Sequence, residues 1–340
     1  MKCKYLSVLI IIVFCFNAFA GDNLIIVAKD GSGDFKTIQE AINSVQSTNR
    51  ERTIIFIKNG VYSEKIFIEK SNLAIIGESA DSTMIIYAEL RKNWRQNNPN
   101  DYGSAVINIK NGITDILFCS LTIHNNYGDL YGDNDHAFAI RGGEGVTRII
   151  IDSCKVISGG GDTVSLWNKD DGMYYHSNSY FEGWVDYVCP RGYCYIENSI
   201  FYGHNLTAAL WHDGSMNENH KFVLRNCRFD GEKGFPLGRF HWDAQFYFIG
   251  CTFSENMADK KIFFAPSTPP RTLNWGESRQ YFFNCHGESV DYDWHLDNME
   301  EAPGKPDPNT ISAVWTFNYK WDPTKELEIF YKSLEGTIQR

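Results

Sequence analysis

The sequence has little of what marks metal-binding, membrane and nucleic-acid-binding proteins. It contains neither Cys-x-x-Cys nor His-x-x-x-His spacing, which argues against a zinc site. Lysine and arginine number 32 against 42 aspartates and glutamates, and the net charge of −10 argues against nucleic acid, whose phosphates require a basic face. Beyond the first 20 residues, no apolar run is long enough to span a bilayer. We therefore expect no metal, no nucleic-acid partner and no membrane anchor.

The first 20 residues have the composition of a secretory signal peptide. A basic start precedes an apolar run from Tyr5 to Phe16, and the sequence AFA that ends at Ala20 provides a small-x-small cleavage site. We therefore expect residues 1–20 to be removed and residues 21–340 to form a single domain. The mature protein is then expected in the periplasm or outside the cell.

Seven cysteines follow the signal peptide, and this odd number leaves at least one unpaired. Five lie inside apolar, strand-like runs, where a small buried thiol is favoured even in an exported chain. Cys189 and Cys194, in CPRGYC, are the one local pair that a disulfide could join. Spacing alone does not fix disulfide geometry, so the sequence leaves the state of this pair open.

The mature chain contains a repeat of short strand-like segments. The clearest units are IIIDSCKVI, YYHSNSYF, CYIENSIF, FVLRNCRF and YFIGCTF, with YFFNCHG and ILFCSLTI as weaker ones. The equivalent Cys or Ser residues are spaced by 25, 20, 28, 24 and 34 residues: Cys154, Ser179, Ser199, Cys227, Cys251 and Cys285. A repeat of this length without helical periodicity predicts a solenoid of short strands. Because equivalent small side chains can stack from coil to coil, we predict an all-β parallel β-helix.

The two ends of the chain lie outside the repeat. Thr37 and Glu40 have capping-box spacing, and apolar residues then recur at helical intervals: Ile38, Ala41, Ile42 and Val45. A short helix there would cap the open end of the solenoid, which otherwise exposes strand edges. After about Gly287 the repeat is lost, and residues 311–315 are predicted as one more strand before a short terminal helix.

A series of motifs runs in order through the mature chain. It begins with VAKDGSGDFKTIQEAINSV, IFIKNGVYSEKIFI and NLAIIGES and continues with LTIHNN, HAFAIR, GDTVSLW, GWVDYV and LGRFHW. Together these motifs resemble the pectin methylesterase family of carbohydrate esterases. Several consecutive matches are a far stronger signal than one short motif. The resemblance implies a right-handed parallel β-helix, in agreement with the repeat, and a pectinesterase activity that needs no cofactor.

The resemblance also implies roles for three residues. The family's glutamine-Asp-Thr motif matches GDT at Asp162, which is expected to be the general acid/base. Its Val-Asp-Phe motif matches VDY at Asp186, the expected nucleophile, and its Leu-Gly-Arg motif matches LGR at Arg239, the cation that holds the nucleophile. Taken singly, Asp162 after three glycines and Asp186 after a strand are ordinary turn residues, and Arg239 is an ordinary surface cation.

The chemistry of two close carboxylates supports these roles. Asp162 and Asp186 are 24 residues apart, about one coil, so they can project into one groove. Like charges raise the pKa of one carboxyl group, and a guanidinium lowers the pKa of the other. Asp186 would then attack the ester carbonyl to form an acyl intermediate, while Asp162 protonates the leaving methanol and later deprotonates water.

Two positions that stabilise the oxyanion in the family are changed here. The family has one glutamine before the acid/base aspartate and another at the start of the preceding strand, and these are Gly161 and His136 in this sequence. Loss of one oxyanion donor typically costs about 10²- to 10³-fold in turnover. We expect His136 to substitute as the donor. Two alternatives are a structural histidine bonded to a turn, and an oxyanion hole formed by the backbone N–H groups of Gly160 and Gly161.

Aromatic residues accompany these motifs. Apolar sugar faces pack on aromatic rings, and the predicted substrate-binding residues are Trp167, Trp184, Tyr187, Trp211 and Trp242. Packing within the coils is an equal alternative for each of them. After Arg239, the family's Pro-Trp is replaced by Phe240 and His241, with Trp242 one place later. The sugar-stacking wall is therefore expected to be rearranged.

These features predict a monomeric, exported esterase that removes methyl groups from galacturonate in a methyl-esterified pectic polysaccharide. The altered oxyanion and wall positions favour a branched or rhamnogalacturonan-type pectin. A catalytically weak pectin-binding β-helix protein is one alternative. A pectate lyase or polygalacturonase is another, and YGH at His204 matches part of a polygalacturonase motif. The paired-aspartate motifs of polygalacturonases are missing, however.

Overall fold

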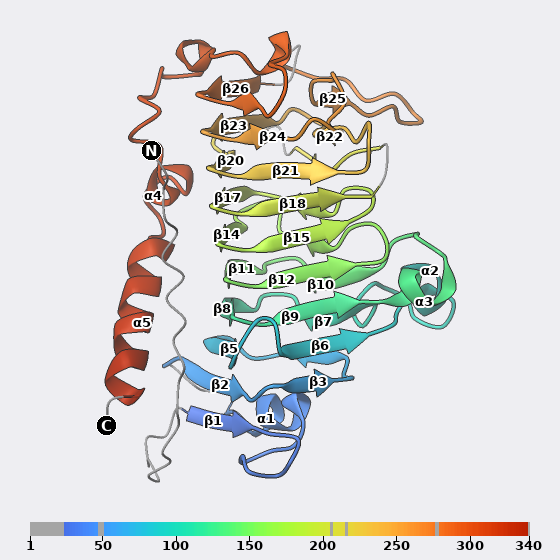
Figure 1. The fold of residues 1–340 in the computed structure, drawn as a ribbon, viewed down its shortest axis with the longest axis vertical. Coiled ribbons are helices and arrows are strands. Elements are labelled where there is room, and N and C mark those ends of the chain that lie inside the picture. The colour runs from blue at the N-terminus through green and yellow to red at the C-terminus, as the bar shows by residue number, and fades with distance from the viewer. Residues whose placement is uncertain (1–23, 47–50, 205–206, 215–216, 276–278, 339–340) are drawn as a thin grey trace. The chain divides into compact units, whose positions relative to one another are not determined.

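The fold was examined in a computed structural model, which describes residues 24–46, 51–204, 207–214, 217–275 and 279–338. The expected signal peptide, residues 1–20, lies outside the described residues. The chain divides into two units, and residues 23–323 form the larger one. This larger unit is a right-handed parallel β-helix, as predicted, in which successive coils stack along one axis (Figure 1).

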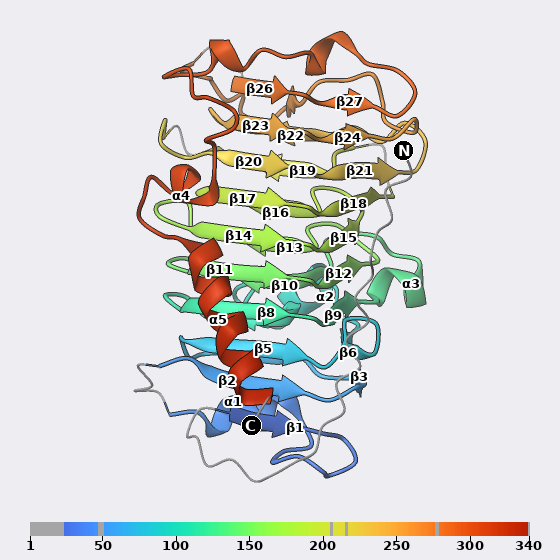
Figure 2. The same cartoon turned by 60° about the vertical axis from the view of Figure 1, so that its left-hand side comes forward.

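Each complete coil contributes one strand to each of three parallel sheets, called A, B and C here (Figures 1 and 2). Sheet A has ten strands: β1 (Leu24–Val27), β2 (Thr53–Ile57), β5 (Leu73–Gly77), β8 (Thr114–Cys119), β11 (Thr147–Asp152), β14 (Met173–Ser177), β17 (Tyr193–Glu197), β20 (Phe222–Arg225), β23 (Gln245–Ile249) and β26 (Arg279–Phe283). Sheet B has nine: β3 (Gly60–Tyr62), β6 (Thr83–Tyr87), β9 (Thr122–Asn125), β12 (Lys155–Ser158), β15 (Tyr180–Gly183), β18 (Ile200–Gly203), β21 (Arg228–Gly231), β24 (Thr252–Phe253) and β27 (His286–Gly287). Sheet C has eight: β4 (Ile66–Ile68), β7 (Ala105–Ile109), β10 (Phe138–Gly142), β13 (Val164–Leu166), β16 (Val188–Pro190), β19 (Leu210–His212), β22 (Gly238–Phe240) and β25 (Phe263–Phe264).

The predicted repeat is confirmed, and it marks the bend between sheets A and B. Each repeat residue follows a sheet A strand, and the residue before it has a left-handed φ, for example 50° at both Asn178 and Asn198. The small side chains bond along the stack. The backbone N–H of Cys154 donates to Ser179 Oγ at 3.1 Å, and that of Ser179 donates to Ser199 Oγ at 3.2 Å. A small residue is therefore needed at this point because its side chain closes the same tight bend in every coil.

Apolar side chains that point into the coils form one continuous core. The rings of Phe181, Phe201 and Phe229 stack along the axis, with centroid separations of 5.4 and 4.6 Å. All three side chains are fully buried. Burial of each such side chain stabilises the fold by roughly 1.5–3 kcal/mol. The core therefore fixes the register of the coils, and with it the positions of the outward-facing residues.

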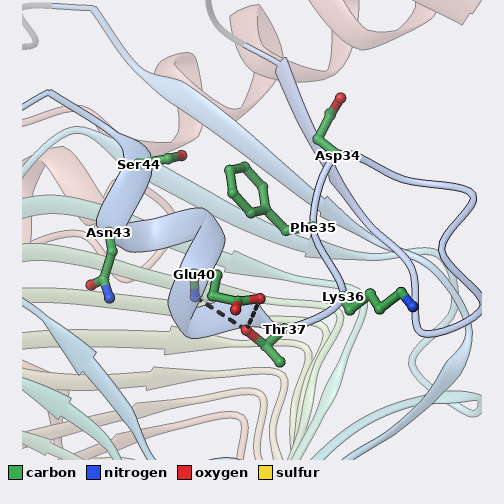
Figure 3. A pocket seen from close by; sticks show the side chains of 7 residues that line it. All are labelled: Asp34, Phe35, Lys36, Thr37, Glu40, Asn43 and Ser44. Carbon is green, nitrogen blue, oxygen red and sulfur yellow. Dashed lines mark hydrogen bonds between the residues drawn. The ribbon is translucent and has the colours of Figure 1, made fainter.

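The predicted capping helix is present as α1 (Ile38–Ser44) at the N-terminal end of the β-helix (Figure 1). Thr37 is its N-cap: its hydroxyl oxygen accepts from the Glu40 N–H at 3.3 Å, and the hydroxyl donates to the Glu40 carboxylate at 2.7 Å (Figure 3). Ile38, Ala41 and Ile42 are buried. The open hollow beside this helix, drawn in Figure 3, lies at the first coils and away from the aspartates singled out above.

The prediction for the C-terminal region is partly wrong. Residues 311–315 do not form a strand: the segment contains helix α4 (Ala313–Thr316), because the Ser312 hydroxyl caps its first turn by accepting from the Trp315 N–H at 3.3 Å. The terminal helix is confirmed as α5 (Pro323–Ile338). The remaining helices are short: α2 (Arg91–Arg95), α3 (Tyr127–Tyr131), η1 (Asp293–His295) and η2 (Met299–Glu301). In the described part of the chain, no helix has the length and apolar character needed to cross a membrane.

The cysteines of the β-helix are buried free thiols. Cys189 lies on β16 of sheet C and donates to the Val164 carbonyl at 3.3 Å, whereas Cys194 lies on β17 of sheet A. The disulfide that the sequence left open between these two residues is therefore absent. Their role is packing between coils.

Candidate active site

Asp162 and Asp186 occupy equivalent positions in neighbouring coils. Each lies two residues before a strand of sheet C, and the register pairs Val164 of β13 with Val188 of β16. Both aspartates have left-handed backbones, with φ of 58° and 53°. Aspartate tolerates this conformation better than most residues, although it still carries strain. The structure therefore brings the two predicted carboxylates to the same edge of sheet C.

The glycine run before the first aspartate lets neighbouring coils approach closely. A Cβ at Gly161 would lie 2.7 Å from the Val185 side chain, and one at Gly160 would lie 2.2 Å from the Asp135 carbonyl oxygen. The Gly160 N–H donates to Ser158 Oγ at 2.9 Å, and the Gly161 N–H donates to the Asp135 carbonyl at 3.2 Å. Both backbone donors are therefore used within the fold, which argues against the alternative of a backbone oxyanion hole.

Arg239, on β22, holds the carboxylate of Asp186. Its Nε lies 2.9 and 3.1 Å from the two carboxylate oxygens, and its Nη2 lies 2.6 Å from Oδ2. Such forked, charge-assisted contacts fix the orientation of a carboxylate. Burial raises the pKa of Asp186 above its ordinary value, and the guanidinium opposes that shift. The arrangement is that of an oriented carboxylate in a site from which water is largely excluded.

Asp162 has the properties of a carboxyl group that is protonated in mildly acidic solution. Burial, with a smaller contribution from the charge of Asp186, raises its pKa to about 6, while His136, Arg191 and Arg141 act in the opposite direction. Its Oδ1 is buried and has no hydrogen-bond partner in the described part of the chain. A buried carboxyl group with a perturbed pKa and an unused oxygen is a candidate proton donor.

His136 lies beside both aspartates. Its positive form lowers the pKa of Asp162 and that of Asp186, so the ring is within electrostatic range of the two carboxyl groups. Its Nδ1 is 2.6 Å from Asp135 Oδ1, and its backbone pairs with Gly161 in an isolated bridge. Within the described residues, its Nε2 makes no hydrogen bond. One nitrogen therefore orients the ring, and the other is available to a ligand.

The predicted aromatic residues do not form a simple sugar-stacking cleft. Tyr187 is a correction: its side chain is fully buried in the core against Phe201, so it cannot contact a substrate. Trp184 stacks on His204, with ring centroids 5.6 Å apart. Cations cover the other predicted rings: guanidinium groups lie near Trp167, Trp211 and Trp242.

Two arginines near the site were not predicted from the sequence. Arg191 follows β16, and its guanidinium carbon lies 3.5 Å from the centroid of the Trp167 ring. Arg141, on β10, lies 4.7 Å from the same ring. In the described residues, no group of three or more His, Cys, Asp or Glu side chains is arranged to hold a metal ion. The positive groups that act on the two aspartates are thus the guanidinium groups of Arg141, Arg191 and Arg239 together with the His136 and His241 rings.

Comparison with known families gives one consistent match. A family model described as pectinesterase matches residues 24–235. Pectinesterase 4 of Arabidopsis thaliana is 28% identical over 222 residues, which is 60% of this chain and 34% of that protein. Putative pectinesterase 11 of the same plant is 27% identical over 280 residues, covering 79% of this chain and 72% of the relative. The chain thus spans about a third of the first of these relatives, 34%, and most of the second.

Solved structures share the fold. Pectin methylesterase PemA from Erwinia chrysanthemi superimposes with a TM-score of 0.70 at 19% identity and covers 90% of this chain and 99% of its own. A pectin methylesterase in complex with a hexasaccharide gives a TM-score of 0.71 at 18% identity, with the same coverage of 90% and 99%. At this level of identity, the superpositions establish the parallel β-helix and no more.

Proposed function

The chain belongs to the pectinesterase family, and on that premise we propose that it hydrolyses the methyl esters of galacturonate in pectin. One observation carries the proposal: a buried carboxyl group with a raised pKa, Asp162, stands one coil from a carboxylate, Asp186, that Arg239 holds in a fork. The two residues thus differ in environment in the way that an acid and a nucleophile require.

The proposed reaction has two steps. In the first, an oxygen of Asp186 attacks the ester carbonyl carbon, the bond to the methoxy oxygen breaks, and Asp162 donates its proton to the leaving methanol. In the second, Asp162 takes a proton from water, whose oxygen attacks the acyl carbon and releases Asp186 and the free galacturonate. The contacts of Arg239 with Asp186 support the first step, because they orient the carboxylate and favour its ionised form.

His136 is proposed as the donor that stabilises the oxyanion. Its Nδ1 contact with Asp135, at 2.6 Å, orients the ring and leaves Nε2 for the substrate. Since the N–H groups of Gly160 and Gly161 already donate to protein oxygens, a side-chain donor is favoured over the backbone.

The proposal extends to location and to substrate. We infer that the protein acts outside the cytoplasm as a monomer, which rests on the composition of residues 1–20 and on the polymeric substrate. A branched or rhamnogalacturonan-type pectin is favoured over a plain galacturonate chain. The support is chemical: His136 stands where the family has glutamine, and Phe240 and His241 stand where it has Pro-Trp.

Methanol release from a panel of esterified pectins, including branched ones, tests this function. We expect release by the wild-type protein and none by Asp186→Asn, because an amide cannot act as the nucleophile. The melting temperature of the variant should stay close to that of the wild type, which excludes unfolding as the cause. Wild-type turnover by Asp186→Asn would refute the mechanism. Unsaturated products would identify a lyase instead, and affinity for pectin without methanol release would identify a binding protein.

A further inference from the structure

Four side chains form a stack on the outer side of sheet C. Arg141 lies on β10, Trp167 directly after β13, Arg191 directly after β16 and Trp211 on β19. These four strands are neighbours in sheet C (Figure 2). The guanidinium of Arg141 lies 4.7 Å from the Trp167 ring centroid, and that of Arg191 lies 3.5 Å from the Trp167 ring and 4.4 Å from the Trp211 ring. Arginine and tryptophan therefore alternate at the spacing of the coils.

Arg191 is the centre of this arginine–tryptophan stack, and its guanidinium makes few hydrogen bonds. Its side chain is 3% exposed, and its Nε forms an ion pair with Asp213 at 3.8 Å, a distance too long for a hydrogen bond. Nη1 donates to the Cys189 carbonyl at 3.1 Å, but Nε and Nη2 have no hydrogen-bond partner among the described residues. A buried, under-bonded guanidinium is costly, and the two tryptophan rings offset only part of that cost. Stability alone does not explain why the chain keeps a cation here.

One end of the arginine–tryptophan stack lies next to the candidate catalytic residues. Trp211 is the register partner of Arg239, whose guanidinium holds Asp186. At the other end, Arg141 shares one carboxylate, that of Asp101, with two further arginines. The stack thus concentrates positive charge next to the aspartates, in a chain whose net charge is −10.

We propose that the arginine–tryptophan stack is the floor of a subsite for an anionic sugar, and that the charge of Arg191, acting without direct contact, favours a free galacturonate carboxylate next to the esterified unit. This inference rests on the proposed function. Because guanidinium groups flank Trp167, a sugar would meet its exposed edge rather than a free ring face; 37% of this residue is exposed. A cation that is largely shielded from water attracts a nearby anion more strongly than a fully solvated cation does. Arg191 is therefore a positioning residue for substrate, distinct from the groups that react.

Binding measured by calorimetry tests the proposal without requiring turnover. The probes are a galacturonate hexamer with free carboxylates and its fully methyl-esterified form, and the ester is titrated in an Asp162→Asn background so that it is not hydrolysed. Arg191→Met keeps the length of the side chain and removes its charge. We expect it to weaken binding of the acid hexamer about tenfold and to change binding of the ester less than threefold. Arg191→Lys, which keeps the charge, should retain more of the acid affinity than Arg191→Met.

Arg279→Met is the matched control, because Arg279 also lies over a tryptophan, Trp275, at 4.2 Å, but on sheet A. It should bind both hexamers as the wild type does.

Added salt should weaken binding of the acid hexamer by the wild type and reduce the difference in affinity between the wild type and Arg191→Met. Unchanged acid affinity in a folded Arg191→Met protein, or equal loss for both hexamers, would overturn the inference. If Arg191→Met does not fold, acid binding by wild type that is insensitive to salt would overturn it. If binding of the acid hexamer depends on Arg191 but the protein releases no methanol, the subsite would be supported and the proposed function refuted.

Discussion

At the scale of single residues, the candidate site owes its chemistry to unequal environments for similar groups. Asp162 and Asp186 share a backbone conformation and a register position, yet only Asp186 meets a guanidinium at hydrogen-bond distance. Asp162 is buried with one oxygen unpaired. Burial raises the pKa of both, and the fork of Arg239 restrains that shift at Asp186. In the proposed mechanism, one arginine, Arg239, two coils from Asp186, therefore sets the difference between acid and nucleophile.

The dependence of kcat/KM on pH should report this difference. In the proposed mechanism Asp162 acts in its protonated form, so kcat/KM should fall as pH rises through about 6, the value to which burial raises its pKa. Asp186 acts in its ionised form in the same mechanism, so kcat/KM should also fall in more acidic solution, below its raised pKa. His136, Arg141 and Arg191 also interact with Asp162. The pKa values measured from the pH profile therefore describe these interacting groups together, not one aspartate alone. A rate that keeps increasing through pH 8 would contradict the role of Asp162 as the acid.

His136 provides a second prediction at this scale. If its Nε2 stabilises the oxyanion, His136→Ala should lower kcat by about 10²-fold with little change in KM, since such a donor acts in the transition state. His136→Gln restores an N–H donor and should recover part of the loss. Asp135→Asn is the companion variant, because Asp135 orients the ring through Nδ1. Normal kcat in His136→Ala, measured by methanol release, would exclude the histidine.

The sequence predicted which polar residues lie together better than it predicted the aromatic residues around them. Asp162, Asp186 and Arg239 could be selected because ordered motifs carry them, and the structure brings them together. Tyr187 was misassigned because alternation alone does not tell which side of a coil a residue faces, and this side chain points into the core. Arg191 was overlooked because an arginine after a short strand is ordinarily a solvated cation, and only the stacking of coils places it between two rings.

At the scale of elements, the bends of the β-helix were predictable and its C-terminal region was not. The repeat of Cys or Ser could be recognised because, in each copy, the side chain donates to the carbonyl two residues earlier and so closes the same bend. Residues 311–315 are apolar and short, which suits a strand or a helix equally well. The N-cap at Ser312 favours helix α4. A single serine is common in all kinds of structure, so it could not be used to predict this helix from the sequence.

The glycine run before Asp162 makes a prediction about stability. Gly161→Ala places a methyl group 2.7 Å from the Val185 side chain, so the coils must move apart, and we expect a loss of about 1–3 kcal/mol in the free energy of unfolding. Gly203→Ala is the control, since its methyl group would meet the nearest atom, of Tyr187, at 3.3 Å. Thermal unfolding of the two variants checks the difference. Equal stability of both would mean that Gly161 is not required for close packing.

At the scale of the whole molecule, the solenoid places equivalent residues of successive coils at a fixed distance along its axis. Residues one coil apart stand about 4.8 Å apart along the axis, so groups from successive coils line up beside a linear polymer. The two aspartates, the forked arginine and the arginine–tryptophan stack all lie on or beside sheet C. One outer side of the β-helix therefore carries both the proposed chemistry and the proposed recognition of the neighbouring sugar. The sequence repeat indicated the solenoid, but not which side of it would carry these groups.

This architecture also allows the proposed ester hydrolysis to be distinguished from elimination by a lyase. The proposed reaction draws its nucleophile, acid and charge stabilisation from side chains, so methanol release should be unchanged by excess EDTA. The physical reason is that a guanidinium, and not a metal ion, supplies the positive charge beside Asp186, with Nη2 to Oδ2 at 2.6 Å. The test is methanol release before and after chelation, followed by addition of calcium, with product absorbance recorded in parallel. Complete loss that calcium reverses, together with unsaturated products, would mean that the carboxylates of this site serve elimination rather than ester hydrolysis.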